Sequence, residues 1–596
     1  MKNNLLASIA LFGIYRNNNQ DTYDLVAQYI SAVIAQKGYG SFTSTDIQSG
    51  LKELYQIDIP IGVINSVCKN RIEGLALSKG TFTCSRIPKD EIEKEYSELI
   101  ANYDALFTAL IDFVKKETDD YTDQLIKDHF ADYLVEGSIQ DTKLNNLYAA
   151  FIASNQESRD IRQKIDLLSS GLISYNGLSY TDTAGNSGAW TDKLTIYLDT
   201  EFLFSCAGYN DSYPQAVFQE LYDLVKEINQ SYRRRTKKQD NLVELKYLKD
   251  TRDVYLSLFN SAKSYIETKG APDPSKKALV KIISESPTIF DVDTHRAKID
   301  TAIKETYQIQ YDDKNYDNYI TDRRYIIFDE PTVTSIAQEY NPKKDDTKTR
   351  KIDYYSRVYT IINGLRGGKS VNIFEKCRYI FLTGSRIGRG ASMAARPDTK
   401  SVTLATDIDF LVSRFWFKLN KQLTNNHIPV SLDIVARSQA VLTREVSRKV
   451  KSLYEELKQK NLSESEQKNL YANLTEAEKY LTPYCSSSTE DVISFIDIKN
   501  VDEMIDNLRD LRRKVAEAEK KEKELSEAKG RLAKKEEEIE GLKKDMADKD
   551  EDHKKLQGDV MEQNAHQRKI IKWLIVSLSI VVVVAIALAV ALLIKR

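Results

Sequence analysis

The stretch Leu194–Phe204, "LTIYLDTEFLF", decides the fold of the central part of the chain. Its first five residues are apolar, β-branched or aromatic, which is typical of a strand buried on both faces of a parallel sheet. Asp199, Thr200 and Glu201 follow directly and interrupt the apolar run. Buried strands ordinarily avoid charge, so two carboxyl groups at this place indicate a binding or capping role.

The sequence around this strand alternates strand-like and helical runs. The runs "LTIYLD" (194–199), "YIIFD" (325–329) and "YIFLTGS" (379–385) have the composition of buried strands. This alternation predicts an α/β domain with a parallel sheet over residues 194–425. Ligands of open parallel sheets bind at the carboxyl ends of the strands, so we expect Asp199 to lie in such a site. A lone carboxylate there also commonly caps the next helix, and Thr200 or Glu201 could serve the same role.

Helical segments flank the predicted sheet domain. Residues 1–90 contain three amphipathic runs and a hairpin pattern turning at Lys79 and Gly80, which predicts a winged-helix-like module. Its third helix offers only Lys69 and Arg71 to phosphates, so we favour an interaction or positioning role over reading of duplex DNA. Residues 91–193 predict a helical connector, and residues 426–499 predict a further helical segment.

The C-terminal part of the sequence predicts a stalk and a membrane anchor. Residues 500–570 are rich in charge and carry an apolar residue at every seventh position, which favours a coiled coil and a homo-oligomer over a solvated single helix. The 22 residues 573–594 contain no charge, which predicts one transmembrane helix. We therefore expect a tail-anchored membrane protein, single-pass at the C-terminus, with the bulk of the chain in the cytoplasm. The predicted fold class is α/β: a parallel-sheet domain with an N-terminal helical module, a coiled coil and one transmembrane helix.

Composition excludes several kinds of site. The formal net charge of −2 creates no global field for polyanions, so any nucleic-acid site must be a local patch. The five cysteines form no CxxC pair and the five histidines form no HExxH motif, which argues against a disulfide framework and a histidine-ligated metal. The late Gly- and Arg-rich stretch lacks the Walker pattern, and no small-molecule cofactor is evident.

Further acidic and hydroxyl residues follow Asp199 in a set order. Asp253 lies in the first turn of one predicted helix, Asp353 begins another, and the strand-like run near residue 380 ends in Thr383 and Ser385. This order resembles the PIN-like family of ribonucleases over about residues 194–425. The resemblance implies acids gathered at the end of a parallel sheet that hold Mg²⁺ or Mn²⁺ and orient a water for attack on an RNA phosphodiester.

The resemblance also implies roles for single residues. Asp199 would be the first metal ligand and Asp353 the acid that heads the helix before the late strand. Asp253 is our choice for the second acid, with Glu339 as the alternative. Thr383 and Ser385 would occupy the late Thr-x-Asp/Asn positions.

Two departures from the family pattern bear on activity. Glu201 stands where the family has a small polar residue, and Ser385 cannot supply the negative charge of the usual acid. Glu201 could offset this loss as an additional metal ligand. Alternatively, it is an acid in the first turn of the next helix with no role in metal binding. Arg386 and Arg389, just past the late strand, are expected to contact phosphate. The sequence thus favours a membrane-tethered, metal-dependent endoribonuclease; the alternative is a catalytically degenerate PIN-like scaffold or sensor that acts through its stalk and a partner.

Overall fold

The computed structural model describes residues 3–18, 20–136, 139, 141–156, 158–178, 190, 192–342, 344–398, 401–419, 428–460, 463–481, 489–498, 535 and 573–580. The chain divides into two compact units, Met1–Arg509 and Asp510–Arg596. Apart from Lys535, the predicted coiled coil of residues 500–570 lies outside the described residues. Of the predicted membrane span only residues 573–580 are described, as helix. In the described part of the chain, no helix combines the length and apolarity needed to cross a membrane.

The N-terminal part of the first unit is mostly helical. Its helices are α1 (Asn3–Asn17), α2 (Thr22–Lys37), α3 (Ser44–Tyr55), α4 (Ile61–Asn70), α5 (Glu93–Glu117), α6 (Asp123–Glu136), α7 (Thr142–Ser154) and α8 (Arg159–Leu178). A small antiparallel sheet has the order β1 (Ser41–Phe42), β3 (Thr81–Cys84), β2 (Leu75–Ser78). The predicted arrangement of three helices followed by a hairpin is present as α2, α3, α4 and β2–β3. Lys79 and Gly80 form the hairpin turn with φ of 50° and 84°.

The central part contains a parallel sheet of five strands, which confirms the predicted α/β class for this region. The strand order is β6 (Gln310–Tyr311), β5 (Val243–Tyr247), β4 (Leu194–Leu198), β7 (Tyr379–Leu382), β8 (Ala405–Thr406), and every neighbouring pair is parallel. All five residues of β4 are buried, as its apolar composition predicts for the central strand.

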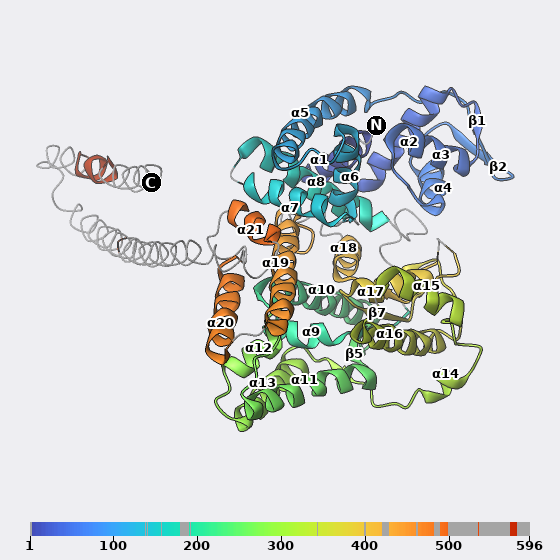
Figure 1. Cartoon of the computed structure of the whole chain (residues 1–596). Helices are drawn as coiled ribbons and strands as arrows, with labels where there is room; N and C mark the ends of the chain where they lie inside the picture. The colour runs from blue at the N-terminus through green and yellow to red at the C-terminus, as the bar shows by residue number, and fades with distance from the viewer. Residues whose placement is uncertain are drawn as a thin grey trace, which may run out of the picture. The chain divides into compact units, whose positions relative to one another are not determined.

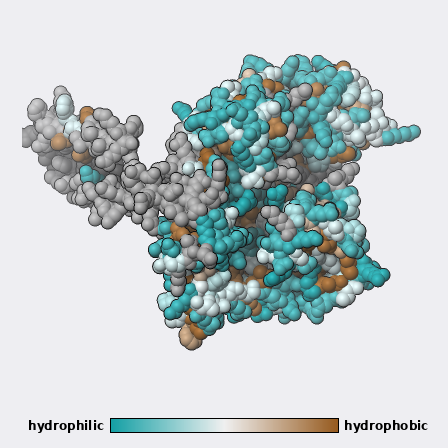
Figure 2. Space-filling model, in the orientation of Figure 1, coloured by the Kyte–Doolittle hydropathy of each residue, from teal (hydrophilic) through white to brown (hydrophobic). Residues whose placement is uncertain are grey.

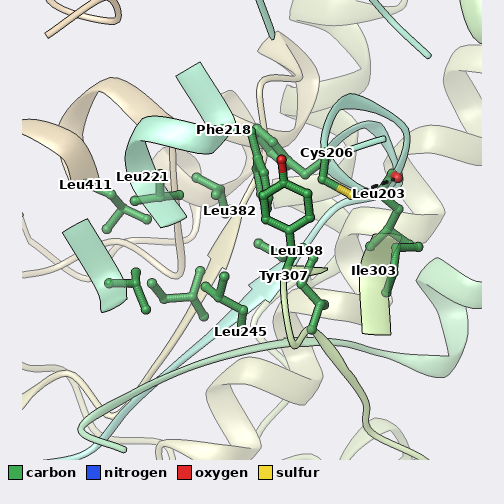
Figure 3. Packing of buried hydrophobic residues seen from close by; sticks show 14 of the residues in the cluster. Leu198, Leu203, Cys206, Phe218, Leu221, Leu245, Ile303, Tyr307, Leu382 and Leu411 are labelled. Atoms are coloured by element: carbon green, nitrogen blue, oxygen red, sulfur yellow. Dashed lines mark hydrogen bonds between the residues drawn. The ribbon is translucent and has the colours of Figure 1, made fainter. Parts of the chain in front are cut away.

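Helices cover both faces of this sheet (Figure 1). They are α9 (Thr200–Ser205), α10 (Ser212–Thr236), α11 (Lys249–Thr268), α12 (Lys277–Ser284), α13 (Ile289–Thr301), α14 (Asp317–Thr321), α15 (Glu330–Tyr340), α16 (Asp346–Leu365), α17 (Arg386–Ala394) and α18 (Ile408–Lys418), with short turns η1 (Ala302–Thr306) and η2 (Phe374–Lys376). Successive residues of β4 point to opposite faces. Leu198 therefore packs with Leu245, Leu382 and Phe218 on one face (Figure 3), whereas Tyr197 belongs to the cluster on the other face.

The predicted strand at residues 325–329 is wrong. Residues 325–328 form a turn and an irregular segment, and Asp329 caps α15 by accepting a hydrogen bond from the Thr332 N–H at 3.0 Å. Of the apolar side chains in this segment only Phe328 is buried, and it is buried by packing rather than by strand pairing, since its ring lies 6.1 Å from that of Tyr359 on α16; Ile326 is 42% exposed. The strand beside β4 is instead β5, whose sequence "VELKY" alternates apolar and polar residues.

Three helices follow the sheet domain: α19 (Ile434–Gln459), α20 (Glu464–Leu481) and α21 (Thr489–Asp497). This agrees with the helical segment predicted for residues 426–499. Helix α19 contacts α7, α8, α20 and α21 (Figure 1).

Candidate functional site

The order of the strands points to one edge of the sheet. The chain first places β5 and β6 on one side of β4, and then returns to place β7 and β8 on its other side. Ligands of open α/β sheets bind outside the carboxyl ends of the strands at the point where the order reverses. Here that point lies between β4 and β7, whose last residues Leu198 and Leu382 are paired. Asp199 and Thr383 follow them, so they meet at this edge.

Asp199 is buried there, with 7% of its surface exposed, and accepts four hydrogen bonds. Its Oδ1 accepts from the Thr200 N–H at 2.8 Å and from the Tyr354 hydroxyl at 3.2 Å. Its Oδ2 accepts from the Tyr355 hydroxyl at 2.9 Å and from the Thr383 hydroxyl at 2.7 Å. A carboxylate offers about four lone-pair sites, so all of them are used within the protein. Asp199 thus joins β4, β7 and α16.

The two tyrosines keep their protons in this arrangement. Burial, together with the nearby charge of Asp199, raises the pKa of both Tyr354 and Tyr355. The Tyr354 hydroxyl also lies 3.0 Å from that of Thr251, which follows β5 on α11. The network around Asp199 therefore spans the carboxyl ends of three adjacent strands.

Glu201 occupies the first turn of α9 and accepts a hydrogen bond from the Gly384 N–H, just past β7. The Glu201 side chain is exposed toward the pocket, but the protein around it still removes much of its hydration. This desolvation, followed by the charge of Asp199, raises the pKa of Glu201 to about 7, although the hydrogen bond from Gly384 and the charges of Arg444 and Lys351 oppose the shift. At neutral pH this carboxyl group can therefore accept or donate a proton.

Glu201 lines a large pocket beside the strand ends. The cavity measures about 1550 Å³ and is bounded by residues from α9, α12, α17, α18 and α19, among other elements. Sites for single small molecules measure about 300–1,000 Å³, so this pocket suits a larger ligand.

Basic residues outnumber acidic ones around the pocket. Nine lysines and arginines line it: Lys276, Lys277, Lys351, Arg386, Arg389, Arg396, Arg437, Arg444 and Arg448. Three of them pair with carboxylates: Lys277 with Asp211 at 2.7 Å, Arg389 with Asp407 at 2.8 Å, and Arg448 with Glu445 at 2.5 Å. Among the residues that the structure describes, the other six have no carboxylate partner. These six exceed the three lining acids that have no basic partner in the described chain, Glu201, Glu339 and Asp409, so the wall carries a net positive charge.

Asp407 and Asp409 are pocket acids that the sequence reasoning missed. Asp407 directly follows β8, caps α18 by accepting from the Phe410 N–H at 2.9 Å, and pairs with Arg389. Desolvation, and then the charge of Asp407, raises the pKa of Asp409 to about 6. The sequence contains a pattern that could have predicted Asp407. In "ATDID" (405–409) an acid directly follows a short strand, as Asp199 does in "YLD" (197–199).

The residues predicted to surround a metal fall in different places. Glu201, Glu339, Arg386 and Arg389 line the pocket. Ser385 caps α17 by accepting from the Gly388 N–H at 3.3 Å. Thr383 contacts Asp199, as described above.

Asp253 and Asp353 are exposed and do not line the pocket. Asp353 lies two residues before Tyr355 on α16, which is a rotation of about 200° at 3.6 residues per turn, so it faces away from Asp199. Within the described ranges, no group of three or more His, Cys, Asp or Glu residues could hold a metal ion. The predicted Mg²⁺ or Mn²⁺ ligands do not fit that role in this arrangement, because Asp199 uses its lone pairs internally and Asp253 and Asp353 lie elsewhere.

Comparisons with protein-family models, with curated proteins and with solved structures find no match to this chain. The geometry of the pocket therefore carries the functional argument.

Proposed function

We propose that the protein binds RNA through its phosphates in this pocket and cleaves phosphodiester bonds there. The observation that carries the proposal is the set of six basic residues without carboxylate partners beside Glu201, at the point where the strand order reverses. Guanidinium groups bind phosphate in two parallel hydrogen bonds, and they stabilise the charge that develops on phosphate during cleavage. The size of the pocket suits several nucleotides better than one.

Glu201 is the proposed proton acceptor. With a pKa of about 7, a substantial fraction of it is ionised at neutral pH and able to take the proton of an attacking ribose 2′-hydroxyl. The 2′-oxygen forms a bond to phosphorus, which gives a 2′,3′-cyclic phosphate, and the bond from phosphorus to the 5′-oxygen of the next nucleotide breaks. That oxygen takes a proton from water, and the resulting hydroxide takes the proton held by Glu201, which restores the carboxylate. The positive charges of Arg444 and Lys351 act on Glu201. In this proposal they also offset the negative charge that develops on the phosphate during the attack.

The test is cleavage of a fluorescent RNA by the full-length chain, with EDTA and with Mg²⁺ or Mn²⁺ in parallel. Glu201→Gln should lower the rate about 100-fold or more, in line with the loss of a general base. Glu267→Gln is the matched control, because Glu267 is exposed on α11 and outside the pocket. Equal rates for the Glu201 variant and the wild type would refute the role of Glu201. Cleavage that requires a divalent ion would favour the metal-dependent reaction that the PIN-like resemblance implies.

A scaffold or sensor without catalysis is the second candidate. The observation that favours it is the full use of Asp199 in hydrogen bonds to Thr383, Tyr354, Tyr355 and Thr200. Such a protein would bind RNA but leave it intact in every arm of the same assay. On the face drawn in Figure 2, the described apolar residues are scattered among hydrophilic ones, so this view shows no broad apolar surface for a protein partner. Membrane tethering and self-association, proposed from the sequence alone, concern the C-terminal residues.

A further inference from the structure

Two helices place arginines on the same pocket from different parts of the chain. Helix α17 of the sheet domain contributes Arg386 and Arg389 from its first half, and Arg396 lies two residues beyond the last residue of the helix. Helix α19, which follows the sheet domain, contributes Arg437, Arg444 and Arg448. The spacings of seven and four residues on α19 return to nearly the same side of a helix. A single face of α19 is therefore directed at the pocket.

The charges of these α19 residues act on the acids of the sheet domain. Arg444 opposes the raised pKa of Glu201, and both Arg437 and Arg444 oppose that of Asp409. Neither arginine has a carboxylate partner within hydrogen-bonding distance in the described part of the chain. Their guanidinium groups are thus near the acids but not neutralised by a direct ion pair.

Hydrogen bonds fix α19 at both ends. At its start, Asp433 accepts from the Val435 N–H at 2.8 Å, and the Ser438 hydroxyl lies 2.9 Å from that of Tyr133 on α6. Near its end, the Tyr454 hydroxyl donates to the Ala271 carbonyl at 2.6 Å, in the segment before α12. The helix is therefore attached both to the N-terminal helices and to the sheet domain, which gives it a defined position beside the pocket.

Unpaired positive charges that line one cavity repel each other, and a bound polyanion removes that repulsion. We propose that α19 forms a second phosphate-binding wall of the pocket, with Arg437 and Arg444 contacting ligand phosphates that also contact Arg386 of α17 and Arg396 just after it. The proposal rests on the proposed function for RNA as the ligand, but it assigns binding residues outside the sheet domain. The helical segment after the sheet domain is then part of the site rather than a spacer.

The experiment measures binding of the full-length chain to a fluorescent 2′-O-methyl RNA of about twelve nucleotides, a length within the range of single-strand sites. The modified ribose prevents attack by the 2′-oxygen, so binding is observed without cleavage. Arg437→Gln and Arg444→Gln should each weaken binding about tenfold and reduce the slope of log affinity against log salt by about one, as expected for a lost phosphate contact. Lys451→Gln is the matched control, because Lys451 lies on the same helix outside the pocket and pairs with Glu455 at 3.8 Å.

A second probe separates this inference from the proposed function. Inorganic triphosphate should raise the melting temperature of the wild type and of the Lys451 variant, and do so less for the Arg437 and Arg444 variants. Binding of triphosphate but not of RNA would refute RNA as the ligand and leave the α19 wall supported. The proposed role of α19 would be overturned if the Arg437 and Arg444 variants matched Lys451→Gln in RNA affinity, in salt slope and in the shift of the melting temperature. Binding of neither probe by the wild type would overturn both proposals.

Discussion

Replacing Asp199 with asparagine separates a structural role of this residue from a metal-binding one. An amide has one oxygen in place of two, and its NH₂ group can only donate. If the NH₂ takes the place of Oδ2, it faces the hydroxyls of Tyr355 and Thr383, which both donate to that oxygen. If it takes the place of Oδ1, it faces the Thr200 N–H, which has no lone pair. With the NH₂ at Oδ2 the two hydroxyls must turn from donors to acceptors, and with the NH₂ at Oδ1 the Thr200 N–H loses its acceptor, so either orientation disrupts the network.

The expected loss follows from these contacts. Two hydrogen bonds to a charged acceptor are weakened, and each such bond contributes about 1.5–3 kcal/mol. Removing the charge also relieves repulsion with Glu201, which offsets part of the loss. We expect Asp199→Asn to lower the free energy of unfolding by about 3 kcal/mol, and Tyr355→Phe, which removes one hydroxyl, to lower it by about 1 kcal/mol.

Urea unfolding followed by tryptophan fluorescence measures this change. Trp190 and Trp416 belong to the hydrophobic cluster that includes Leu198 of β4, so their emission reports on this core. A loss of about 3 kcal/mol corresponds to a midpoint lowered by about 1 M or more at typical urea dependences. Asp253→Asn, at an exposed position, is the control and should leave the midpoint unchanged. A midpoint for Asp199→Asn at or above that of the wild type would refute the structural role, and is the outcome expected if the charge is retained for a metal.

Two other predictions concern acidic residues, one in the pocket and two outside it. Because the pKa of Glu201 is raised to about 7, its neutral form is favoured in the folded protein below that pH, and its charge appears as the pH rises through about 7. RNA affinity should therefore fall and cleavage should rise over that interval, and Glu201→Gln should flatten both profiles in anisotropy and cleavage assays. Asp253→Asn and Asp353→Asn should keep the cleavage rate within about twofold of wild type, because neither residue lines the pocket. A loss of rate comparable to that of Glu201→Gln would instead support the metal-ligand role that the sequence predicted for these two residues.

Much of the fold could be predicted from the sequence where local pattern and tertiary role agree. The apolar run of β4 and the acid after it were sufficient to place Asp199 at the carboxyl edge of a parallel sheet. The prediction failed at residues 325–329, because an apolar run of that length can be buried by helix packing as well as by strand pairing. It also missed β5, where Glu244 and Lys246 interrupt the apolar residues of a half-buried strand.

The candidate site was predicted less completely than the fold. The position of Asp353 on the far side of α16 from Asp199 depends on how the helix is rotated about its axis when Tyr354 and Tyr355 both reach Asp199, and local sequence does not specify that rotation. The arginines of α19 gave no distinct signal either, because a row of basic residues on a helix is ordinarily a solvated face. Their proximity to Glu201 results from long-range packing of a segment that follows the sheet domain.

The hydrogen bond between Asp199 and Thr383 joins residues 184 positions apart in the sequence. During synthesis at about 5–20 residues per second, β4 leaves the ribosome about 10 to 40 seconds before its partner strand β7 is made. Throughout that interval the central strand has an open edge and a carboxylate without its Thr383 partner. The nascent sheet domain therefore exposes an unpaired strand edge until β7 is made, and the pocket is completed only after α19 has also been synthesised.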